Sequence, residues 1–413
     1  MKALVFGTET QPFTPPPDAN RLVRNLASTP CALVEVPDAR PLRPDWYVVR
    51  PLLTGICGSD SKQVLMDFEG DSDSAMSGLC SFPQVLGHEV VGLVHSAGPE
   101  ASGFEVGDRV ALNPWLSCVP RGITPICPAC EAGDLSLCWS FTAGDISPGL
   151  HTGVSSDATG GYAELMPAHS SMLFAVPDDV DDGHAILADP FAVSLHSVTR
   201  HPPPPGGRAL VWGAGALGCS AVAILAALYP DVEIAVVARF DAQAALARRL
   251  GAHAVFRLDT TAALVEQLAE WSGGVLKPTM PGLDGIPMCH PGFIDVAYDT
   301  VAKPETFEVE VRVLRARGTL VKSGVHAPGR WEWSPLYFKE ISLVGSNAFG
   351  IEDVDGVRRH GIEHYFDLAS AGRVDLTGML THTFGLTEWQ DAFWACADQE
   401  RSGAIKVALD PAR

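Results

Sequence analysis

The pattern of apolar and polar positions changes near residue 190. Before it, short apolar runs alternate with turns rich in glycine and proline, as in WYVVRPLL (46–53), EVVGLVHSAG (89–98) and VGDRVAL (106–112). Short strands separated by frequent turns are typical of a β-rich domain. Four consecutive prolines, 202–205, followed by two glycines then interrupt the chain.

From residue 208 the pattern alternates between strands and helices. It predicts strands over 208–212, 233–238, 292–299, 318–325 and 341–346, with helices over 216–228, 241–250 and 306–317. Such alternation indicates a parallel, doubly wound sheet. The pattern therefore predicts an α/β protein in which a β-rich part precedes this sheet.

The segment after about residue 347 is mixed. Its pattern predicts a helix near 361–371, a strand near His382, a helix near 388–396 and a final strand IKVAL (405–409). Two earlier stretches, 67–82 and 277–291, are predicted to be long loops, and loops of that length are often functional.

Length and charge narrow the class of protein. A chain of 413 residues is long enough for two domains, and its net charge of −20 argues against nucleic acid or an anionic membrane as a partner. No apolar run approaches the ~20 residues of a membrane helix, and the N-terminus lacks a secretory signal, so the expected location is cytoplasmic. Four of the ten cysteines lie between Cys118 and Cys138, which indicates metal binding rather than a disulfide scaffold.

A glycine-rich turn marks a dinucleotide site. It consists of Gly213, Ala214, Gly215, Ala216, Leu217 and Gly218, and it follows a predicted strand and opens an apolar helix. The glycines permit a tight turn, and the free N–H groups of the helix N-terminus attract a pyrophosphate.

The end of the second strand of this unit should select the cofactor. An acidic residue there binds the ribose hydroxyls of NAD, whereas an arginine accommodates the 2′-phosphate of NADP. Here Ala238 occupies the acidic position and Arg239 follows it. The sequence therefore favours NADP over NAD; the alternative is that Arg239 points into solvent and either cofactor is accepted.

A first set of metal ligands is suggested by Cys57, by His88 with Glu89, and by Asp189. Thiolate, imidazole and carboxylate groups all bind Zn²⁺. Each residue alone has a structural explanation, because isolated cysteines and histidines are usually packed in the core or lie on the surface.

Several spaced motifs together resemble the zinc-containing medium-chain alcohol dehydrogenase family. They occur in the family's order over nearly the whole chain: GICGSD (55–60), GHEVVG (87–92), VGDRV (106–110), the cysteine cluster, ADPFAVSLH (188–196), GAGALG (213–218) and IKVAL (405–409). The resemblance implies a GroES-like catalytic domain of residues 1–190 and 347–413, with a Rossmann cofactor domain of residues 191–346 between them and the active site in the cleft. Within the family, a carboxylate at position 189 resembles the residue found there in the polyol and threonine dehydrogenase branches.

The resemblance also implies roles for single residues. Cys57, His88 and Asp189 are expected to bind a catalytic zinc, and Glu89 can also enter its coordination sphere. Ser59 is expected to hold the substrate hydroxyl and start proton transfer. Three further positions concern the surroundings of this site: Asp60 would orient His88, Lys62 stands where several members end the proton relay with a histidine, and the backbone of Val325 is a candidate contact for the nicotinamide, with a packed strand residue as the alternative.

The cysteine cluster departs from the family spacing at one position. The family usually has C-x2-C-x2-C-x7-C, and Cys127, Cys130 and Cys138 fit its last three positions. Thr124 stands where the first cysteine would be, and Cys118 is the available substitute. A structural zinc site formed by four thiolates is expected, and the alternative is a metal-free lobe.

The function implied is hydride transfer between a secondary or polyol-like alcohol and NADP or NAD, giving a ketone or aldehyde, with one catalytic and one structural zinc. Trp115 and Phe141 could shape the substrate pocket or belong to the core. The resemblance implies a homodimer or homotetramer.

Two rival interpretations are a zinc-free quinone or enoyl reductase and a non-enzymatic protein that binds nucleotide or metal. Two zinc ions per chain would favour the dehydrogenase.

Overall fold

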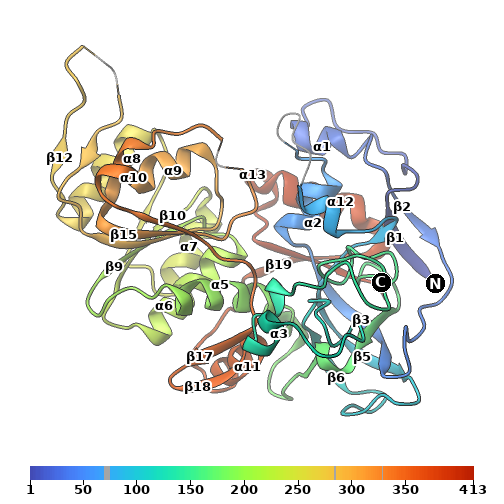
Figure 1. Ribbon diagram of the computed structural model, residues 1–413. Coiled ribbons are helices and arrows are strands. Elements are labelled where there is room, and N and C mark those ends of the chain that lie inside the picture. Colours follow the sequence, from blue (N-terminus) through green and yellow to red (C-terminus); the bar gives the residue numbers. More distant parts are fainter. Residues whose placement is uncertain (69–74, 283–284, 328) are drawn as a thin grey trace.

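The computed structural model describes residues 1–68, 75–282, 285–327 and 329–413. It has two parts, which lie side by side in Figure 1. One part contains a six-stranded parallel sheet and the other a seven-stranded, mainly antiparallel sheet. None of the described helices combines the length and apolar character required to cross a membrane.

The seven-stranded sheet combines strands from the first half of the chain with two strands from its C-terminal end. Its order is β19-β20-β3-β5-β6-β8, with β7 also paired to β3. The strands are β3 (Trp46–Gly55), β5 (Glu89–Ala97), β6 (Arg109–Leu112), β7 (Met166–His169), β8 (Leu173–Ala175), β19 (Leu380–Gly385) and β20 (Lys406–Asp410). Because β20 runs antiparallel to β3, with Ala408 opposite Gly55, the last strand of the chain supports the segment that leads to Cys57.

Short elements surround this sheet. A small sheet contains β2 (Cys31–Glu35), β1 (Lys2–Phe6) and β4 (Gln84–Val85). The helical elements are α1 (Arg21–Asn25), α2 (Gly58–Val64), η1 (Ala75–Leu79), α3 (Pro128–Ala132), η2 (Leu135–Leu137), η3 (Ser170–Met172), α4 (Asp182–Ala185), α11 (Gly361–Ser370), η4 (Leu386–Glu388), α12 (Trp389–Ala397) and α13 (Gln399–Ser402). A hairpin of β17 (Ile351–Val354) and β18 (Val357–His360) lies near α11 at the bottom of Figure 1.

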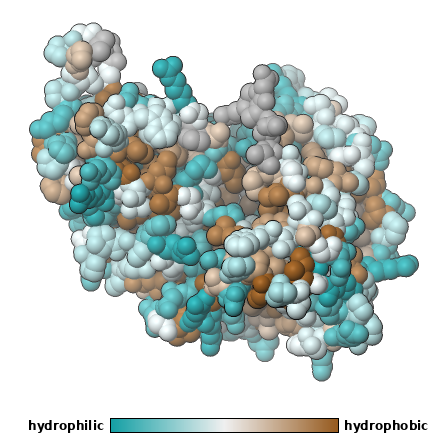
Figure 2. All heavy atoms as spheres, in the orientation of Figure 1, coloured by the Kyte–Doolittle hydropathy of each residue, from teal (hydrophilic) through white to brown (hydrophobic). Residues whose placement is uncertain are grey.

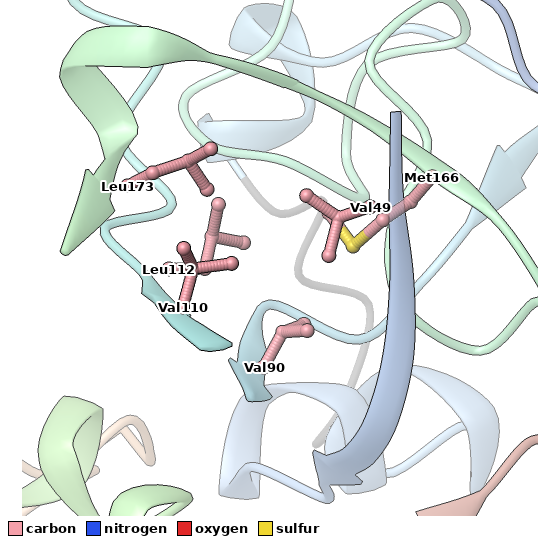
Figure 3. Close-up of a pocket in the computed structure, with 6 residues that line it drawn as sticks. All are labelled: Val49, Val90, Val110, Leu112, Met166 and Leu173. Atoms are coloured by element: carbon pink, nitrogen blue, oxygen red, sulfur yellow. The ribbon is translucent and has the colours of Figure 1, made fainter. Parts of the chain in front are cut away.

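The interior of the seven-stranded sheet is tightly packed. Figure 3 shows six apolar side chains that converge from β3, β5, β6, β7 and β8: Val49, Val90, Val110, Leu112, Met166 and Leu173. They enclose no space large enough for a water molecule, so this region is core and not a ligand site.

The parallel sheet has the order β11-β10-β9-β14-β15-β16. Its strands are β9 (Arg208–Trp212), β10 (Glu233–Val237), β11 (Ala254–Phe256), β14 (Ile294–Asp299), β15 (Leu314–Lys322) and β16 (Ser342–Gly345), and a separate pair is formed by β12 (Leu276–Lys277) and β13 (Met288–Cys289). The helices are α5 (Ala188–Arg200), α6 (Ala216–Leu228), α7 (Asp241–Arg249), α8 (Thr261–Ser272), α9 (Pro304–Val313) and α10 (Ser334–Phe338). The predicted α/β class, with a parallel sheet covered by helices beside a β-rich part, is confirmed.

Alternation along β9 explains why helices cover both faces. Val211 packs in the core cluster that contains α5 and α6, whereas the adjacent Leu210 packs in the cluster of α8 and α9. Successive side chains of a strand point to opposite faces, so both faces of this sheet are apolar and both need a covering layer.

One boundary prediction was wrong. The helix expected over 306–317 ends at Val313, and β15 already begins at Leu314. Within β15 the pairing with β14 shifts register, and Arg317 has a φ of 58°, so the strand is irregular where the pattern resembled a helix. The loop predicted at 277–291 contains β13, and the loop predicted at 67–82 contains η1, while its residues 69–74 lie outside the described part.

Candidate active site and zinc centres

Three expected ligands meet beside the end of β3. Cys57 is the N-cap of α2, His88 precedes β5, and Glu89 is the first residue of β5, opposite Gly55. One ligand atom from each lies within 4.8 Å of the others. A thiol, an imidazole and a carboxylate gathered in this way can bind zinc.

Asp60 holds His88 in place. Its Oδ1 lies 3.4 Å from Nδ1 of His88, and its Oδ2 accepts hydrogen bonds from the hydroxyl of Tyr162 at 2.9 Å and from the N–H of Cys57 at 3.1 Å. Burial alone would raise the pKa of Asp60, but the charge of His88 and these hydrogen bonds lower it. The carboxylate therefore fixes the orientation of the ring, which also lies close to the thiol of Cys57.

Lys406 is a site residue that sequence reasoning missed. Its ammonium forms a buried ion pair with Glu89 and donates to the carbonyl of Ile56 at 3.0 Å. Burial by itself would lower the pKa of Lys406, but the negative charges of Glu89 and Cys57 raise it. The motif that contains Lys406 was recognised, yet nothing local to it indicates a partner more than three hundred residues earlier.

Asp189 lies in the first turn of α5 and is buried. Its Oδ2 has no hydrogen-bond partner among the described residues, and burial raises its pKa to about 7, although the charge of His88 lowers it. Its carboxylate does not belong to the group of ligand atoms within 4.8 Å that Cys57, His88 and Glu89 form. An unpaired buried carboxylate beside such a group suits a cation as its missing partner.

Ser59 and Lys62 project from α2. Ser59 is half-buried, and its hydroxyl forms no hydrogen bond with any other residue that the structure describes. The ammonium of Lys62 donates to the carbonyl of Val325 at 3.2 Å. Val325 lies beyond the end of β15 and its side chain is 47% exposed, so the alternative of a packed strand residue does not hold. This hydrogen bond links the part that contains the seven-stranded sheet to the part that contains the parallel sheet.

His151 is a second residue that sequence reasoning missed. Its ring centroid lies 4.5 Å from that of His88 and 5.7 Å from that of Trp115. Burial, followed by the positive charge of His88, lowers the pKa of His151 to about 3. Trp115 and Phe141 are both buried members of one core cluster, and their ring centroids lie 6.2 Å apart, so of these two aromatic residues it is Trp115 that contacts His151.

The four clustered cysteines converge as expected. Sγ of Cys138 lies 3.6 Å from that of Cys118 and 3.9 Å from that of Cys127, and all four ligand atoms, including Sγ of Cys130, lie within 4.8 Å of one another. Sulfurs at the corners of a tetrahedron are about 3.8 Å apart when each Zn–S bond is about 2.3 Å. Three of these sulfurs also accept a hydrogen bond from a backbone N–H group: Cys118 from Cys127, Cys127 from Trp139, and Cys138 from Ser140. The arrangement fits a structural zinc, with Cys118 in place of the family's first cysteine.

Arg121 explains how the longer loop between Cys118 and Cys127 is accommodated. Its guanidinium is fully buried and donates to five carbonyl oxygens, those of Leu116, Ala143, Ile146, Ser147 and Gly149. Burial lowers the pKa of Arg121 to about 10, while the nearby Cys138 raises it. One side chain therefore fixes the loop on both sides of the cysteine lobe.

The glycine-rich turn has the shape a dinucleotide requires. Gly213 has a φ of 92°, and a β-carbon there would lie 2.6 Å from Oγ1 of Thr300. Gly215 is the N-cap of α6, no side chain caps it, and no atom lies within 4 Å of the place a β-carbon would take. A β-carbon on Gly218 would overlap the carbonyl of Gly213. The residues between them, Ala216 and Leu217, form the first turn of α6, so free N–H groups face open space that a pyrophosphate can fill.

Two arginines flank the end of β10. Ala238 is buried, whereas Arg239 is exposed and its guanidinium lies 5.0 Å from the ring centroid of Phe240. Arg257, which sequence reasoning missed, donates to the carbonyl of Arg239 and forms an ion pair with Asp241. The region is therefore positively charged and supplies no carboxylate at position 238.

Comparisons with known proteins agree with this geometry. An alcohol dehydrogenase GroES-like domain model matches residues 43–178, and a zinc-binding dehydrogenase model matches residues 216–361. The (R,R)-butanediol dehydrogenase of Saccharomyces cerevisiae is 26% identical over 380 residues, which cover 86% of this chain and 89% of that protein. The L-threonine 3-dehydrogenase of Deinococcus radiodurans is 28% identical over 371 residues, which cover 89% and 91%.

A solved structure shows the same fold. The alcohol dehydrogenase of Escherichia coli CFT073 complexed with NADH has a TM-score of 0.72 and 22% identity, over 99% of both chains. Together with the two matching domain models, these relatives confirm the resemblance found in the sequence. The chain belongs to the zinc-type medium-chain alcohol dehydrogenases of the polyol-like branch, enzymes that transfer a hydride between an alcohol or carbonyl compound and a nicotinamide cofactor.

Proposed function

We propose that this enzyme oxidises a secondary or polyol-like alcohol to the ketone, and reduces the ketone in the reverse direction, at a zinc site formed by Cys57, His88 and a carboxylate. Asp189 is the carboxylate we assign. The observation that carries this proposal is the buried, unpaired Oδ2 of Asp189 beside the gathered thiol and imidazole. Glu89 is the alternative ligand, but it is already paired with Lys406.

The chain's own residues prepare this site. When bound, zinc supplies a Lewis acid for the substrate oxygen, and the nicotinamide cofactor exchanges the hydride. Asp60 keeps His88 oriented, and Ser59, two residues after Cys57, offers a free hydroxyl that accepts a hydrogen bond from the alcohol and releases its own proton to solvent as it takes up the alcohol's proton. Lys62 holds α2 against Val325, which keeps these groups next to the cofactor part.

For the cofactor we propose a preference for NADP. The absence of a carboxylate at Ala238 supports it, and so does the exposed guanidinium of Arg239, which forms no ion pair within the described part of the chain, while Arg257 is paired with Asp241 and holds the backbone at Arg239. An arginine guanidinium bonds a phosphate in bidentate fashion, which an NAD ribose does not require.

We further propose that each chain holds two zinc ions, one in the active site and one in the four-cysteine lobe. We assign residues 1–190 and 347–413 to the catalytic domain and residues 191–346 to the cofactor domain, which agrees with the pairing of β20 with β3 and of β9 with β10 and β14.

A homodimer or homotetramer is also proposed. The edge strand β16 supports it, because Leu343 on this strand is exposed and so are Tyr337 and Phe338 on the adjacent α10. Figure 2 shows apolar side chains among the hydrophilic ones on one face of the molecule. The cytoplasmic location stays a prediction.

Metal analysis combined with an activity screen tests the proposed function. We expect two zinc ions per chain and NADP-dependent oxidation of secondary or polyhydroxy alcohols. Removal of the active-site zinc by a chelator should abolish turnover, and added zinc should restore it. One zinc per chain, held by the cysteines alone, together with reduction of quinones or enones, would instead support a zinc-free reductase.

A further inference from the structure

His151 lies beside the proposed metal ligands without being one of them. Its ring is tilted by 50° against that of His88, and its other side meets Trp115 in an edge arrangement with an interplanar angle of 81°. The imidazole is therefore held between a metal-binding histidine and the aromatic wall formed by Trp115 and Phe141.

The hydrogen bond of His151 determines which nitrogen is free. Nδ1 lies 2.7 Å from the carbonyl oxygen of Thr152. A carbonyl oxygen can only accept, so Nδ1 carries the proton and Nε2 of the neutral ring presents a lone pair. Nε2 has no partner among the described residues, and it is not one of the buried unpaired atoms, so it remains accessible.

The backbone around His151 is fixed on both sides. The N–H of Leu116 donates to the carbonyl of Leu150 at 3.1 Å, and the N–H of Thr152 donates to that of Pro114 at 2.8 Å. Arg121 binds the carbonyl of Gly149 at 2.7 Å. An acceptor held by such contacts is already oriented before a ligand arrives.

We propose that His151 is a specificity-determining residue whose free Nε2 accepts a hydrogen bond from a second hydroxyl of the substrate, on the carbon next to the reacting alcohol. This inference rests on the proposed function and narrows its substrate class to vicinal diols and longer polyols. The reacting oxygen belongs at Cys57 and His88, and the ring of His151 lies 4.5 Å from that of His88 between centroids. A hydroxyl on the carbon next to the reacting one would be offered to this ring, whereas a simple alcohol has only hydrogen at that carbon. A ring that merely packed against Trp115 would need no free acceptor.

Two alcohols that differ by one hydroxyl test the proposal: 2,3-butanediol and 2-butanol. At pH 8, where an ordinary imidazole is neutral, we expect the unmodified enzyme to favour the diol in kcat/KM. His151→Phe keeps a ring but removes the acceptor, so it should lower kcat/KM for the diol by about 2- to 12-fold, chiefly through KM. The value for 2-butanol should stay within about twofold, which is below the smallest effect of one lost hydrogen bond.

His151→Gln and His95→Phe complete the set. Glutamine carries a carbonyl acceptor at the end of its side chain and should restore part of the diol preference. His95 is exposed on β5, and its replacement by phenylalanine should change neither substrate. Zinc content should remain the same in all variants, because His151 is not among the clustered ligands.

A binding measurement separates this inference from the proposed function. Without cofactor no turnover occurs, and the rise in thermal midpoint caused by each alcohol reports binding alone. We expect the diol to stabilise the unmodified enzyme more than 2-butanol does, and the difference to disappear in His151→Phe. Failure to oxidise either alcohol, with this difference intact, would overturn the proposed function only. An undiminished diol preference in His151→Phe, in either measurement, would overturn the role of His151.

Discussion

Lys406, from the last strand of the chain, forms a buried ion pair with Glu89, the residue after the proposed ligand His88. Strand β3 leaves space for the carboxylate of Glu89 at Gly55, because a β-carbon at that position would overlap the carboxylate. The pair determines whether Glu89 is available to the metal.

Lys406→Met should therefore destabilise the metal-free protein more than the zinc-loaded protein. Removing one partner of a buried pair costs about 3–5 kcal/mol, because the remaining charge is uncompensated. If Glu89 can turn to the zinc, the bound metal neutralises it and the cost falls. Denaturant unfolding of the variant and the unmodified protein, with and without chelator, measures both differences. Glu89→Gln combined with Lys406→Met should recover most of the stability, and equal costs in both metal states would show that Glu89 does not reach the zinc.

Cys57→Ala or His88→Ala should abolish turnover while leaving the fold and NADP binding largely intact. Both residues belong to the cluster that also contains Glu89, and neither holds the core of a domain. Steady-state kinetics, zinc analysis and cofactor titration check this, with Cys31→Ala, in the separate strand β2, as the control. A variant that loses its active-site zinc and keeps near-normal turnover would refute the zinc mechanism.

Cys130→Ser should destabilise the chain rather than alter its chemistry selectively. Four sulfurs surround the expected ion, and a structural zinc contributes directly to local folding. A loss of about 3 kcal/mol would lower the thermal midpoint by roughly 3 to 6 °C. Calorimetry and zinc analysis provide the measurement, and Cys289→Ala, buried elsewhere, is the matched control. An unchanged midpoint with two bound zinc ions would contradict the four-cysteine assignment.

Cofactor choice should depend on the residues after β10. We expect NADP to be preferred by roughly tenfold to a hundredfold in kcat/KM, because charge-assisted hydrogen bonds are worth about 1.5–3 kcal/mol. The double change Ala238→Asp and Arg239→Ala should reverse the preference, since it adds a repulsive acid and removes the attraction. Arg248→Ala, exposed on α7, should have no effect. A clear preference of the unmodified enzyme for NAD would show that Arg239 does not contact the cofactor.

His360 should make stability depend on acid pH. Burial lowers its pKa to about 3, although the charge of Glu352 raises it, and its ring is stacked on Phe174 at 4.4 Å. The unfolded chain therefore binds the proton more readily, so this contribution to stability is present above about pH 6.5 and is lost as the pH falls towards 3. The slope is at most about 1.4 kcal/mol per pH unit.

His360→Asn isolates that effect. Asparagine can still cap α11 through its side-chain oxygen, as Nδ1 of His360 now does by accepting from the N–H of Ile362 at 3.3 Å, but it does not titrate. The variant should be less stable at pH 7 because the stacked ring is lost, yet its stability should fall less steeply between pH 6.5 and 4. Denaturant unfolding at several pH values measures the slope, and parallel profiles for the two proteins would show that His360 does not titrate in this range.

Local sequence was enough for the residues whose function depends on neighbours in the chain. Gly213, Gly215 and Gly218 share one turn, and His88 and Glu89 are adjacent, so their spacing alone indicates a phosphate-binding turn and a metal site. The strands of the parallel sheet were predicted because their alternation and length follow from burial on both faces.

Tertiary structure decided the remainder. Lys406 reaches Glu89, Arg121 binds Gly149, Lys62 reaches Val325, and His151 meets His88, each through a fold-dependent contact between separate segments. No periodicity carries that information, because side-chain periodicity reports which face is buried and not which residue lies opposite. The sequence by itself thus determined the family, the fold class and the ligands grouped in local motifs, whereas only folding determined which charges compensate one another and which nitrogen of His151 remains free, since both depend on the distances between segments far apart in the chain.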